Sequence, residues 1–217
     1  MNPLGALLDV LFPPKCIFCG TLLPSGVDGV CDECRKTLPF TRGKARSIEG
    51  IPTVMSAFYY EGEVREALLR YKFANCSSSA KTFAKFMSET VENSSDVLYD
   101  TISWVPLSRR RERKRGYDQA YLLARSMARN LGREVTPTLR KVRHIQAQSG
   151  LASAEARRNN ISGCYELAPG FSPAGKRILL VDDIVTTGST LSECARMLKA
   201  GGAEEVLAVT AATAALH

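Results

Sequence analysis

The sequence contains no apolar run long enough to cross a lipid bilayer, so we predict no membrane span. The N-terminal region offers one apolar stretch, Leu4–Phe12. It has neither a basic segment before it nor a small-residue cleavage site after it, so we do not predict a signal peptide. These absences predict a cytoplasmic protein in a reducing compartment. The chain also has no internal repeat and no low-complexity tract, and repeat architectures are therefore not expected.

Histidine is scarce as well, with 2 residues in the whole chain. One of them, His144, lies among cations. A role as a general acid or base stays open there, but its neighbours favour a position on the surface.

The length of 217 residues suits one α/β domain of ordinary size together with a small appendage. A hydrophobic content of 45% and a charged content of 24% are typical of soluble globular proteins. The formal net charge of +7 is moderate. It permits acidic partners such as phosphosugars or nucleic acid but establishes neither of them.

Four of the seven cysteines form two C-x-x-C pairs separated by eleven residues, namely Cys16 with Cys19 and Cys31 with Cys34. Two such pairs predict a tetrahedral zinc site, because each pair forms a tight turn and the thiolates converge on one ion. Disulfides or free thiols are the weaker interpretation in a reducing compartment. Four cysteine ligands leave no open position for a substrate, so we expect the zinc to be structural. The remaining cysteines show no pairing pattern.

The most informative stretch is Ile178–Leu191, which reads ILLVDDIVTTGSTL. Its first four residues form a short apolar run, typical of a strand buried on both faces of a parallel sheet. Asp182 and Asp183 stand where this strand is expected to end. A hydroxyl-rich turn follows, and a helix is expected from Leu191 to Lys199. The turn consists of Thr186, Thr187, Gly188, Ser189 and Thr190.

This order of strand, acid pair, turn and helix indicates a sugar phosphate site. A turn before a helix N-terminus presents backbone N–H groups and hydroxyls to a phosphate. Ligands of open α/β sheets bind at the carboxyl ends of strands. Two carboxylates would repel the phosphate if they faced it, but they can accept hydrogen bonds from the ribose diol. A capped helix with two solvated acids is the alternative, although a cap needs only one hydroxyl. The stretch resembles the binding motif for phosphoribosyl pyrophosphate in type I phosphoribosyltransferases.

A second strand, Ile102–Val105, is followed by a strongly basic segment. Six of the seven residues Arg109–Arg115 are basic, and a helix is expected over Asp118–Leu131. Such a charge run is often only a solvated loop. Its position after a strand gives it another interpretation, in which one loop holds a monophosphate and the other a pyrophosphate. The candidate pyrophosphate or nucleic-acid contacts here are Arg110, Arg111, Arg113, Lys114, Arg115 and Tyr117.

Hydrophobic periodicity predicts the rest of the chain. We expect helices over 3–12, 64–73 and 80–91, strands over 54–60 and 205–213, and a linker over 38–52. A second basic region covers residues 139–160, with a short helix over 152–158. The role of Arg140–Asn160 is not readable from its pattern. The chain is thus predicted to divide into a cysteine module, residues 1–40, and an α/β domain, residues 41–217.

Five features occur together along nearly the whole chain: the four-cysteine module, Tyr71-Lys72-Phe73, VPLSRRRERKRGYDQA at Val105–Ala120, the Gln148…Asn159 region and the LLVDDIVTTGSTL motif. This set resembles the ComF family of competence-type, phosphoribosyltransferase-like proteins. The resemblance implies a type I phosphoribosyltransferase fold, a parallel sheet flanked by helices, with an N-terminal zinc finger. It also implies an association with the uptake or handling of transforming DNA.

The resemblance also implies residue roles. Asp182 and Asp183 would be the catalytic residues, which hold the ribose diol and orient the ring, and residues 186–190 would hold the 5′-phosphate. The segment Leu107, Ser108 and Arg109 would form the pyrophosphate loop, and residues 110–119 a mobile loop that closes over it. Mg²⁺ would accompany the pyrophosphate. Two positions depart from the family, which usually has Asn at Asp118 and Arg at Ala156.

Three functions remain open from the sequence. The first is a phosphoribosyltransferase with an unidentified acceptor, since no segment can be assigned to reading a nucleobase. The second is a module that binds single-stranded DNA, with the basic segments along the backbone and Tyr117 as a stacking platform. The third is an adaptor whose zinc module docks a partner such as a DNA-uptake translocase or another competence protein.

Overall fold

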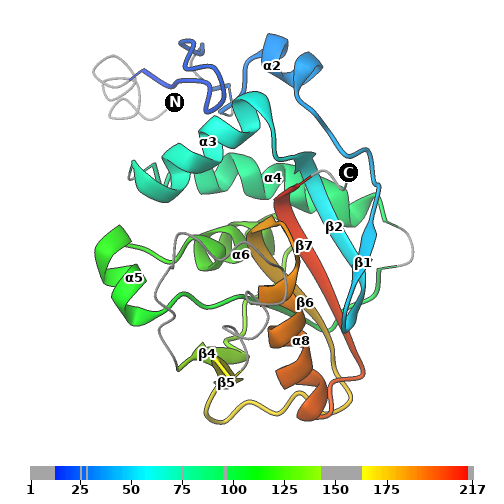
Figure 1. The fold of residues 1–217 in the computed structure, drawn as a ribbon. Coiled ribbons are helices and arrows are strands. Elements are labelled where there is room, and N and C mark those ends of the chain that lie inside the picture. Colours follow the sequence, from blue (N-terminus) through cyan, green and yellow to red (C-terminus); the bar gives the residue numbers. More distant parts are fainter. Residues whose placement is uncertain are drawn as a thin grey trace.

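The computed structural model describes residues 13–24, 26–27, 29–74, 76–94, 97–142 and 163–214 (Figure 1). The helices predicted over 3–12 and 152–158 lie outside these residues. Within them the helices are α2 (Asp32–Thr37), α3 (Gly62–Phe73), α4 (Ser79–Glu92), α5 (Arg109–Arg115), α6 (Gln119–Asn130) and α8 (Ser189–Ala200). The strands are β1 (Arg46–Ile48), β2 (Ile51–Tyr59), β3 (Thr101–Trp104), β4 (Leu139–Lys141), β5 (Tyr165–Leu167), β6 (Arg177–Val185) and β7 (Glu205–Thr213).

A five-stranded sheet of order β1-β2-β7-β6-β3 forms the centre of the molecule. The pairs β2–β7, β7–β6 and β6–β3 are parallel, whereas β1 joins the edge antiparallel to β2. The strands β6 and β7 read as nearly continuous apolar runs because helices cover both faces of the sheet. The helices α4 and α6 contact one face and α8 contacts the other. No helix in the described part of the chain is long and apolar enough to cross a membrane.

Two hydrophobic cores result from this layering. The larger core joins α3, α4 and α6 to one face of the sheet, and it includes Cys16 and Phe18 from the cysteine module. The smaller core lies between the other face, α8 and Tyr165 of β5. Because the cysteine module contributes to the larger core, the predicted division at residue 40 has no gap in packing to mark it. That division stays a prediction.

Most predicted elements are present with bounds shifted by one to three residues, and β7 occupies the predicted 205–213. The prediction is wrong for the second half of the 38–52 linker, which contains β1 and the start of β2. The strand β6 is also longer than predicted. It continues through both aspartates to Val185, because its ladder with β7 extends through Asp182↔Thr210 and Val185↔Thr213.

Candidate functional site

A cleft of about 230 Å³ opens at the carboxyl ends of β3 and β6. These strands are parallel neighbours, with Trp104 beside Val181, so the segments that follow them meet at one edge of the sheet. Leu107 from the first segment lines the cleft together with Asp182, Asp183 and Thr190 from the second. The structure therefore brings together the acid pair and the beginning of the predicted pyrophosphate loop.

The two aspartates differ in their partners. The Asp183 backbone N–H donates to Asp182 Oδ1 over 2.8 Å. The Asp183 carboxylate itself pairs with Lys72, whose Nζ lies 3.0 Å from Oδ1. Burial and, to a smaller extent, the negative charge of Asp183 raise the pKa of Asp182 to about 8. The site thus holds one paired carboxylate and one acid that takes up a proton near neutral pH.

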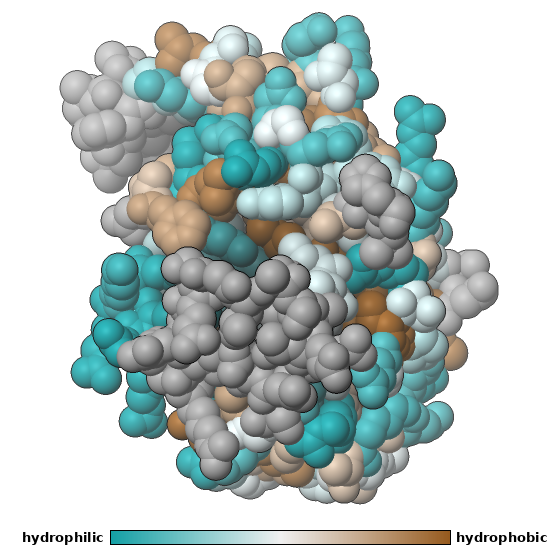
Figure 2. All heavy atoms as spheres, in the orientation of Figure 1, coloured by the Kyte–Doolittle hydropathy of each residue, from teal (hydrophilic) through white to brown (hydrophobic). Residues whose placement is uncertain are grey.

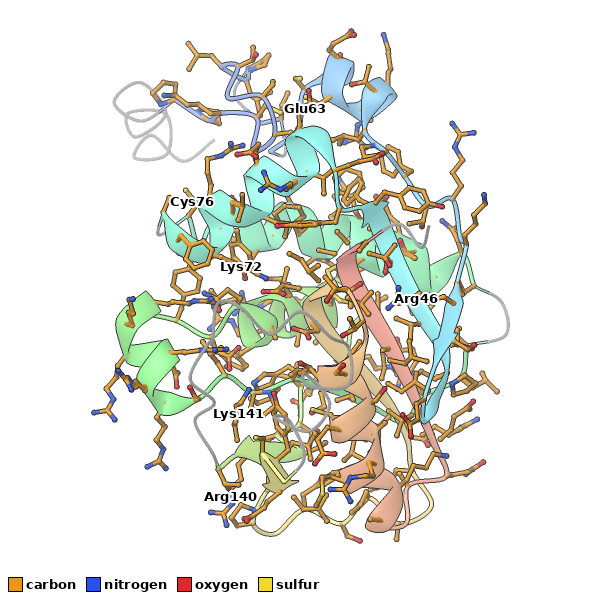
Figure 3. The ribbon with its side chains drawn as sticks, viewed as in Figure 1. Arg46, Glu63, Lys72, Cys76, Arg140 and Lys141 are labelled. Carbon is orange, nitrogen blue, oxygen red and sulfur yellow. The ribbon has the colours of Figure 1, made fainter. Side chains whose placement is uncertain are left out.

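Lysines enter the cleft from two other elements, and Figure 3 shows them on opposite sides of it, Lys72 on α3 and Lys141 on β4. The Lys141 Nζ donates to the Tyr165 hydroxyl over 2.9 Å and lies 4.7 Å from the centre of that ring. Burial lowers the pKa of Lys141. The sequence pattern indicates no role in the site for Lys72, and Lys141 belongs to a basic region whose function the pattern does not predict. Only the folding of distant segments brings both amines to Asp182 and Asp183.

The segment Thr186–Thr190 leads into α8, whose first two residues are Ser189 and Thr190. Gly188 has a φ of +80°, and a Cβ atom there would lie 2.9 Å from Ile48 of β1. Both the left-handed backbone and this close approach require glycine. The Thr187 and Ser189 hydroxyls bond to each other over 2.9 Å. The segment thus places hydroxyl groups at the N-terminus of α8, where negative charge is favoured.

Arg46 of β1 is a second residue near this turn that the sequence did not identify. Its Nη2 donates to the Thr186 carbonyl over 2.6 Å. Its Nε and Nη1 are shielded from solvent and have no hydrogen-bond partner among the described residues. Burial lowers the pKa of this guanidinium. An anion beside the turn would supply the hydrogen-bond acceptor that these two nitrogens lack.

The residues of the predicted pyrophosphate loop occupy different environments. Leu107 lines the cleft, Ser108 is buried, and Arg109 is exposed as the first residue of α5. The residues 109–115 form this helix rather than an irregular loop, and it ends at Gly116 with a φ of +84°. Of its cations, Arg111 and Arg115 line the cleft, whereas Arg110, Arg113 and Lys114 are exposed.

Tyr117 directly follows Gly116 in the chain and is partly buried. Its hydroxyl donates to the Tyr71 backbone carbonyl, and its ring packs 5.9 Å from the Tyr71 ring. The Tyr71 hydroxyl in turn donates to the Gln119 carbonyl over 2.8 Å. Tyr117 therefore joins the α5–α6 connection to α3 through both its hydroxyl and its ring.

Asp118 is the N-cap of α6 and connects it to the segment after β3. Its Oδ1 accepts from the Tyr121 N–H over 3.1 Å, and its Oδ2 accepts from the Leu107 N–H over 2.8 Å. Burial raises the pKa of this carboxyl. Asp118 is one of the two positions at which the sequence departs from the family, and here its carboxylate accepts hydrogen bonds from two backbone N–H groups.

Replacing Asp118 by alanine is expected to lower the free energy of unfolding by about 2 kcal/mol, because a cap is lost and two N–H groups lose their acceptor. Asparagine keeps one acceptor oxygen, so it should recover about half of this loss. Urea denaturation of the three proteins measures the difference. Equal midpoints for wild type and Asp118→Ala would contradict the assigned role.

The four cysteines of the N-terminal module converge, and their Sγ atoms all lie within 4.8 Å of one another. Cys16 and Cys34 are buried, whereas Cys19 is exposed. Four thiolates at this spacing fit a structural zinc ion with a complete tetrahedral shell. The donor set agrees with the sequence prediction.

The cysteine module is tied to the cleft by α3. Arg70 Nη2 donates to the carbonyls of Ile17 and Phe18, over 2.7 Å and 2.8 Å, in the turn between Cys16 and Cys19. Two residues further along α3, Lys72 pairs with Asp183. One helix therefore carries both the anchor of the zinc turn and a cation of the cleft.

Two families of known protein domains match the two parts of the chain. The phosphoribosyl transferase domain family matches residues 118–215, and the double zinc ribbon domain family matches residues 7–57. The fold is accordingly that of a phosphoribosyltransferase, with a four-cysteine zinc module at its N-terminal end.

Three relatives align with most of the chain. Competence protein F of Haemophilus influenzae is 29% identical, and the alignment covers 88% of this chain and 93% of the relative. Competence protein ComFC of Bacillus subtilis is 29% identical, with coverages of 90% and 76%. DNA utilization protein YhgH of Salmonella typhi is 31% identical, with coverages of 88% and 80%. Together with the zinc module and the phosphoribosyltransferase domain, these alignments show that the chain belongs to the ComF family.

Proposed function

We propose that the cleft binds phosphoribosyl pyrophosphate, or a closely related ribose phosphate, together with Mg²⁺. The observation that carries this proposal is the arrangement on β6 and α8, where two carboxylates and a glycine turn follow one another at the edge of one cleft. The 5′-phosphate would lie at residues 186–190, near the unpartnered nitrogens of Arg46. The ribose diol would lie against Asp182 and Asp183.

The cations of the cleft suit the other end of this ligand. Arg111, Arg115 and Lys141 line the cleft and would pair with the pyrophosphate. Mg²⁺ would be held by ligand oxygens beside Asp182 and Asp183, where it would neutralise the leaving group. The Asp183 carboxylate lies 3.0 Å from Lys72 Nζ, so it would face the ribose as the acidic member of an ion pair.

The reaction that this arrangement supports is a phosphoribosyl transfer to an unidentified acceptor. The bond between the anomeric carbon and the pyrophosphate oxygen would break, and the acceptor's lone pair would form the new bond. The oxygen takes the bonding electrons with it, so positive charge develops on the ribose, and the carboxylates at its 2′ and 3′ hydroxyls would stabilise that charge. The cations around the pyrophosphate would stabilise the departing charge.

Binding is expected to release a proton from Asp182. Its pKa of about 8 means that the free protein holds this acid largely protonated at pH 7. Hydrogen bonds donated by the ribose diol favour the ionised form, so the affinity should rise as the pH increases from 6 to about 8 and then level off. Calorimetry at pH 7 in buffers of different ionisation enthalpy measures the released proton.

Asp182→Asn supplies the control for this experiment, because its amide cannot titrate. The difference in proton release between wild type and this variant should approach one proton, which removes the contribution of the ligand's own phosphates. Identical proton release by the two proteins would contradict the assignment of the titrating group.

Single-stranded DNA binding is a second candidate, and the exposure of α5 favours it. None of the residues of α5 is buried, and Figure 2 shows hydrophilic surface where Figure 1 places this helix. A cationic helix beside the cleft would track a phosphate backbone. The competence and DNA-utilization names of the relatives also favour a role in DNA handling. They agree equally with a third candidate, an adaptor that docks a DNA-uptake translocase through the zinc module.

The variant Arg110→Glu/Lys114→Glu is expected to weaken binding of a short single-stranded oligonucleotide about tenfold or more at low salt. Both residues are exposed and neither lines the cleft, so ribose phosphate binding should persist. The slope of log affinity against log salt should also decrease, by about 0.7 for each phosphate contact that is lost. Fluorescence anisotropy at several salt concentrations measures both quantities.

The matched control is Lys44→Glu/Lys176→Glu, which makes the same change of charge at two exposed lysines outside the cleft. If this control loses as much affinity as the α5 variant, the effect reflects net charge alone and a specific role for α5 is excluded.

A further inference from the structure

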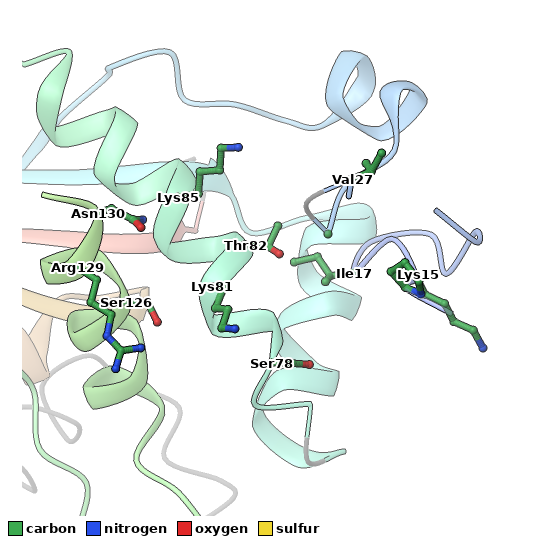
Figure 4. A pocket seen from close by; sticks show the side chains of 12 residues that line it. Lys15, Ile17, Val27, Ser78, Lys81, Thr82, Lys85, Ser126, Arg129 and Asn130 are labelled. Carbon is green, nitrogen blue, oxygen red and sulfur yellow. The ribbon is translucent and has the colours of Figure 1, made fainter. Parts of the chain in front are cut away.

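Buried side-chain nitrogens without a hydrogen-bond partner occur on two residues in the described part of the chain, Arg46 and Gln119. Arg46 bonds to the Thr186 carbonyl before α8, whereas Gln119 is the first residue of α6 and lines the cleft. A second pocket, of about 560 Å³ between the cysteine module and the helices α4 and α6, contains neither residue (Figure 4). The unpartnered nitrogens therefore lie in or beside the cleft.

The side-chain amide of Gln119 has a fixed orientation. Arg115 Nη1 donates to its Oε1 over 2.9 Å. Because a guanidinium group only donates, the amide oxygen must face Arg115 and the amide nitrogen must point away from it. Gln119 is buried, with 2% of its surface accessible, and its Nε2 has no acceptor among the described residues.

The groups around Gln119 are engaged in other bonds. The Tyr71 hydroxyl donates to the Gln119 backbone carbonyl over 2.8 Å, which fixes the main chain whatever the side chain at this position. Both carboxylate oxygens of Asp118 accept from backbone N–H groups. A buried donor without an acceptor is costly, and native proteins pair nearly all such groups. An unpaired donor on a residue that lines a cleft thus indicates a group of a ligand.

The cations beside Gln119 indicate the kind of acceptor. Arg111 and Arg115 line the cleft with it, and the guanidinium carbon of Arg115 lies 5.0 Å from the centre of the Phe73 ring. An oxygen placed beside these two guanidinium groups is favoured when it carries negative charge. The last torsion of a glutamine side chain has broad preferences, so a small rotation of the amide presents Nε2 to such an oxygen.

We propose that Gln119 contacts the ligand and determines specificity, with its Nε2 donating to an oxygen of the pyrophosphate. The inference rests on the proposed function of the cleft and adds a neutral donor at the pyrophosphate end. A buried donor that bonds one ligand rejects an analogue that leaves it unpaired. Gln119 thus favours phosphoribosyl pyrophosphate over ribose 5-phosphate, which lacks the pyrophosphate.

The variant Gln119→Met tests this proposal, because methionine has a similar length and no donor. It is expected to bind phosphoribosyl pyrophosphate with Mg²⁺ about tenfold or more weakly, since a hydrogen bond to a charged group is lost. Its affinity for ribose 5-phosphate should equal that of wild type. Calorimetry measures the first ligand, and titration followed by nuclear magnetic resonance measures the second.

Asn130→Leu is the matched control. It removes another side-chain amide from α6, at the last residue of that helix, and Figure 4 shows Asn130 at the second pocket. This control should bind both ligands as wild type does. Circular dichroism checks the fold of each protein. If Gln119→Met does not fold, Gln119→Glu replaces it with the same expectations, because glutamate keeps an oxygen for Arg115 and its ionised form has no donor.

The double variant Gln119→Met/Arg115→Met separates contact with the ligand from the positioning of Arg115. If Gln119 bonds the ligand itself, its replacement should weaken binding of phosphoribosyl pyrophosphate by about the same factor with or without Arg115. If Gln119 acts only by holding Arg115, the double variant should bind no more weakly than Arg115→Met alone.

Three results would overturn the proposal. They are unchanged binding of phosphoribosyl pyrophosphate by the folded Gln119 variant, equal weakening of both ligands, and no further loss in the double variant. Absence of phosphoribosyl pyrophosphate binding by the wild type would instead reject the proposed function of the cleft, and this inference with it.

Discussion

Replacing Cys34 by serine is expected to lower the free energy of unfolding by about 3 kcal/mol or more and to release the structural zinc. Cys34 is buried, and its Sγ belongs to the cluster in which the four sulfur atoms lie within 4.8 Å of one another. A three-cysteine site leaves the ion without a complete shell, and the two turns then lose the constraint that holds them together.

The size of this effect follows from Phe18, which lies in the turn between Cys16 and Cys19. Its ring packs edge-on against Phe58 and Phe83, each at 5.7 Å, and against Phe86 at 6.5 Å. Removing a buried phenylalanine from a core costs about 3–5 kcal/mol. If zinc loss frees the turn, the larger core loses the packing of the Phe18 ring in addition to the Cys34 side chain.

The effect should also reach the cleft through α3. Arg70 would lose the two carbonyls that it holds in the zinc turn, and Lys72 lies two residues further along the same helix. Affinity for phosphoribosyl pyrophosphate is therefore expected to decrease in Cys34→Ser even though no cysteine lines the cleft.

Urea denaturation followed by circular dichroism measures the stability, and a colorimetric zinc assay on the unfolded protein measures the metal. Cys76→Ser is the matched control, because Cys76 lies outside the cluster and its Sγ donates a weak bond to the Ala74 carbonyl. Equal midpoints for the two variants, each with one bound zinc, would contradict the four-cysteine site.

The double variant Asp182→Asn/Asp183→Asn is expected to weaken binding of phosphoribosyl pyrophosphate with Mg²⁺ by about a hundredfold or more. Hydrogen bonds to a charged acceptor contribute about 1.5–3 kcal/mol each, and two of them would be replaced by weaker neutral ones. Asparagine preserves the shape of both side chains, so the change removes charge and basicity and leaves the packing of β6 in place.

Stability should respond in the opposite sense to affinity. Burial of Asp182 raises its pKa to about 8, so its contribution to stability is present below its unfolded value and is lost as the pH rises through 8. Asparagine at position 182 avoids that cost, so Asp182→Asn alone should unfold no more easily than wild type at pH 8, whereas Asp183→Asn also loses the ion pair with Lys72. A loss of binding with retained stability separates a role in the site from a role in the fold.

Isothermal titration calorimetry measures the affinity, and Asp100→Asn is the matched control. Asp100 pairs with Arg177 at the opposite end of β6, far along the strand from the cleft. Undiminished binding by the double variant would remove the acid pair from the site.

The sequence predicted the part of the site that is local in the chain. A strand, an acid pair, a hydroxyl turn and a helix lie within Ile178–Leu191, and each has its own signal in composition and spacing. The end of β6 was misplaced because polar residues suggested that the strand stops at Asp182. Its partner β7 continues alongside and pairs with it to Val185. The end of β6 therefore depends on the length of the neighbouring strand and not on the residues of β6 alone.

The linker predicted over 38–52 shows the same limit. Its composition of proline, glycine and scattered charge hides β1, a strand of only three residues. Ile48 of this strand packs against Gly188, and Arg46 reaches Thr186, 140 residues away in the sequence. A contact across this separation leaves no local pattern to read.

The helix α5 is predictable from local features of the basic segment. Arginine, lysine and glutamate have high helix propensity, and Ser108 and Gly116 flank the run as an N-cap residue and a left-handed stop. Charge density favoured a loop, whereas propensity and the flanking residues correctly indicate α5. In contrast, Lys72 and Lys141 could not have been assigned to the cleft, since their roles depend on how α3 and β4 pack around β6.

A crystal structure with phosphoribosyl pyrophosphate and Mg²⁺ shows whether the β6–α8 segment holds a ribose phosphate. We expect the 5′-phosphate at Thr186–Thr190, the ribose hydroxyls within hydrogen-bond distance of Asp182 and Asp183, and the pyrophosphate towards Arg111, Arg115 and Lys141. Ligand density in another place, or an empty cleft in crystals soaked at saturating ligand with the cleft open to solvent, would contradict it.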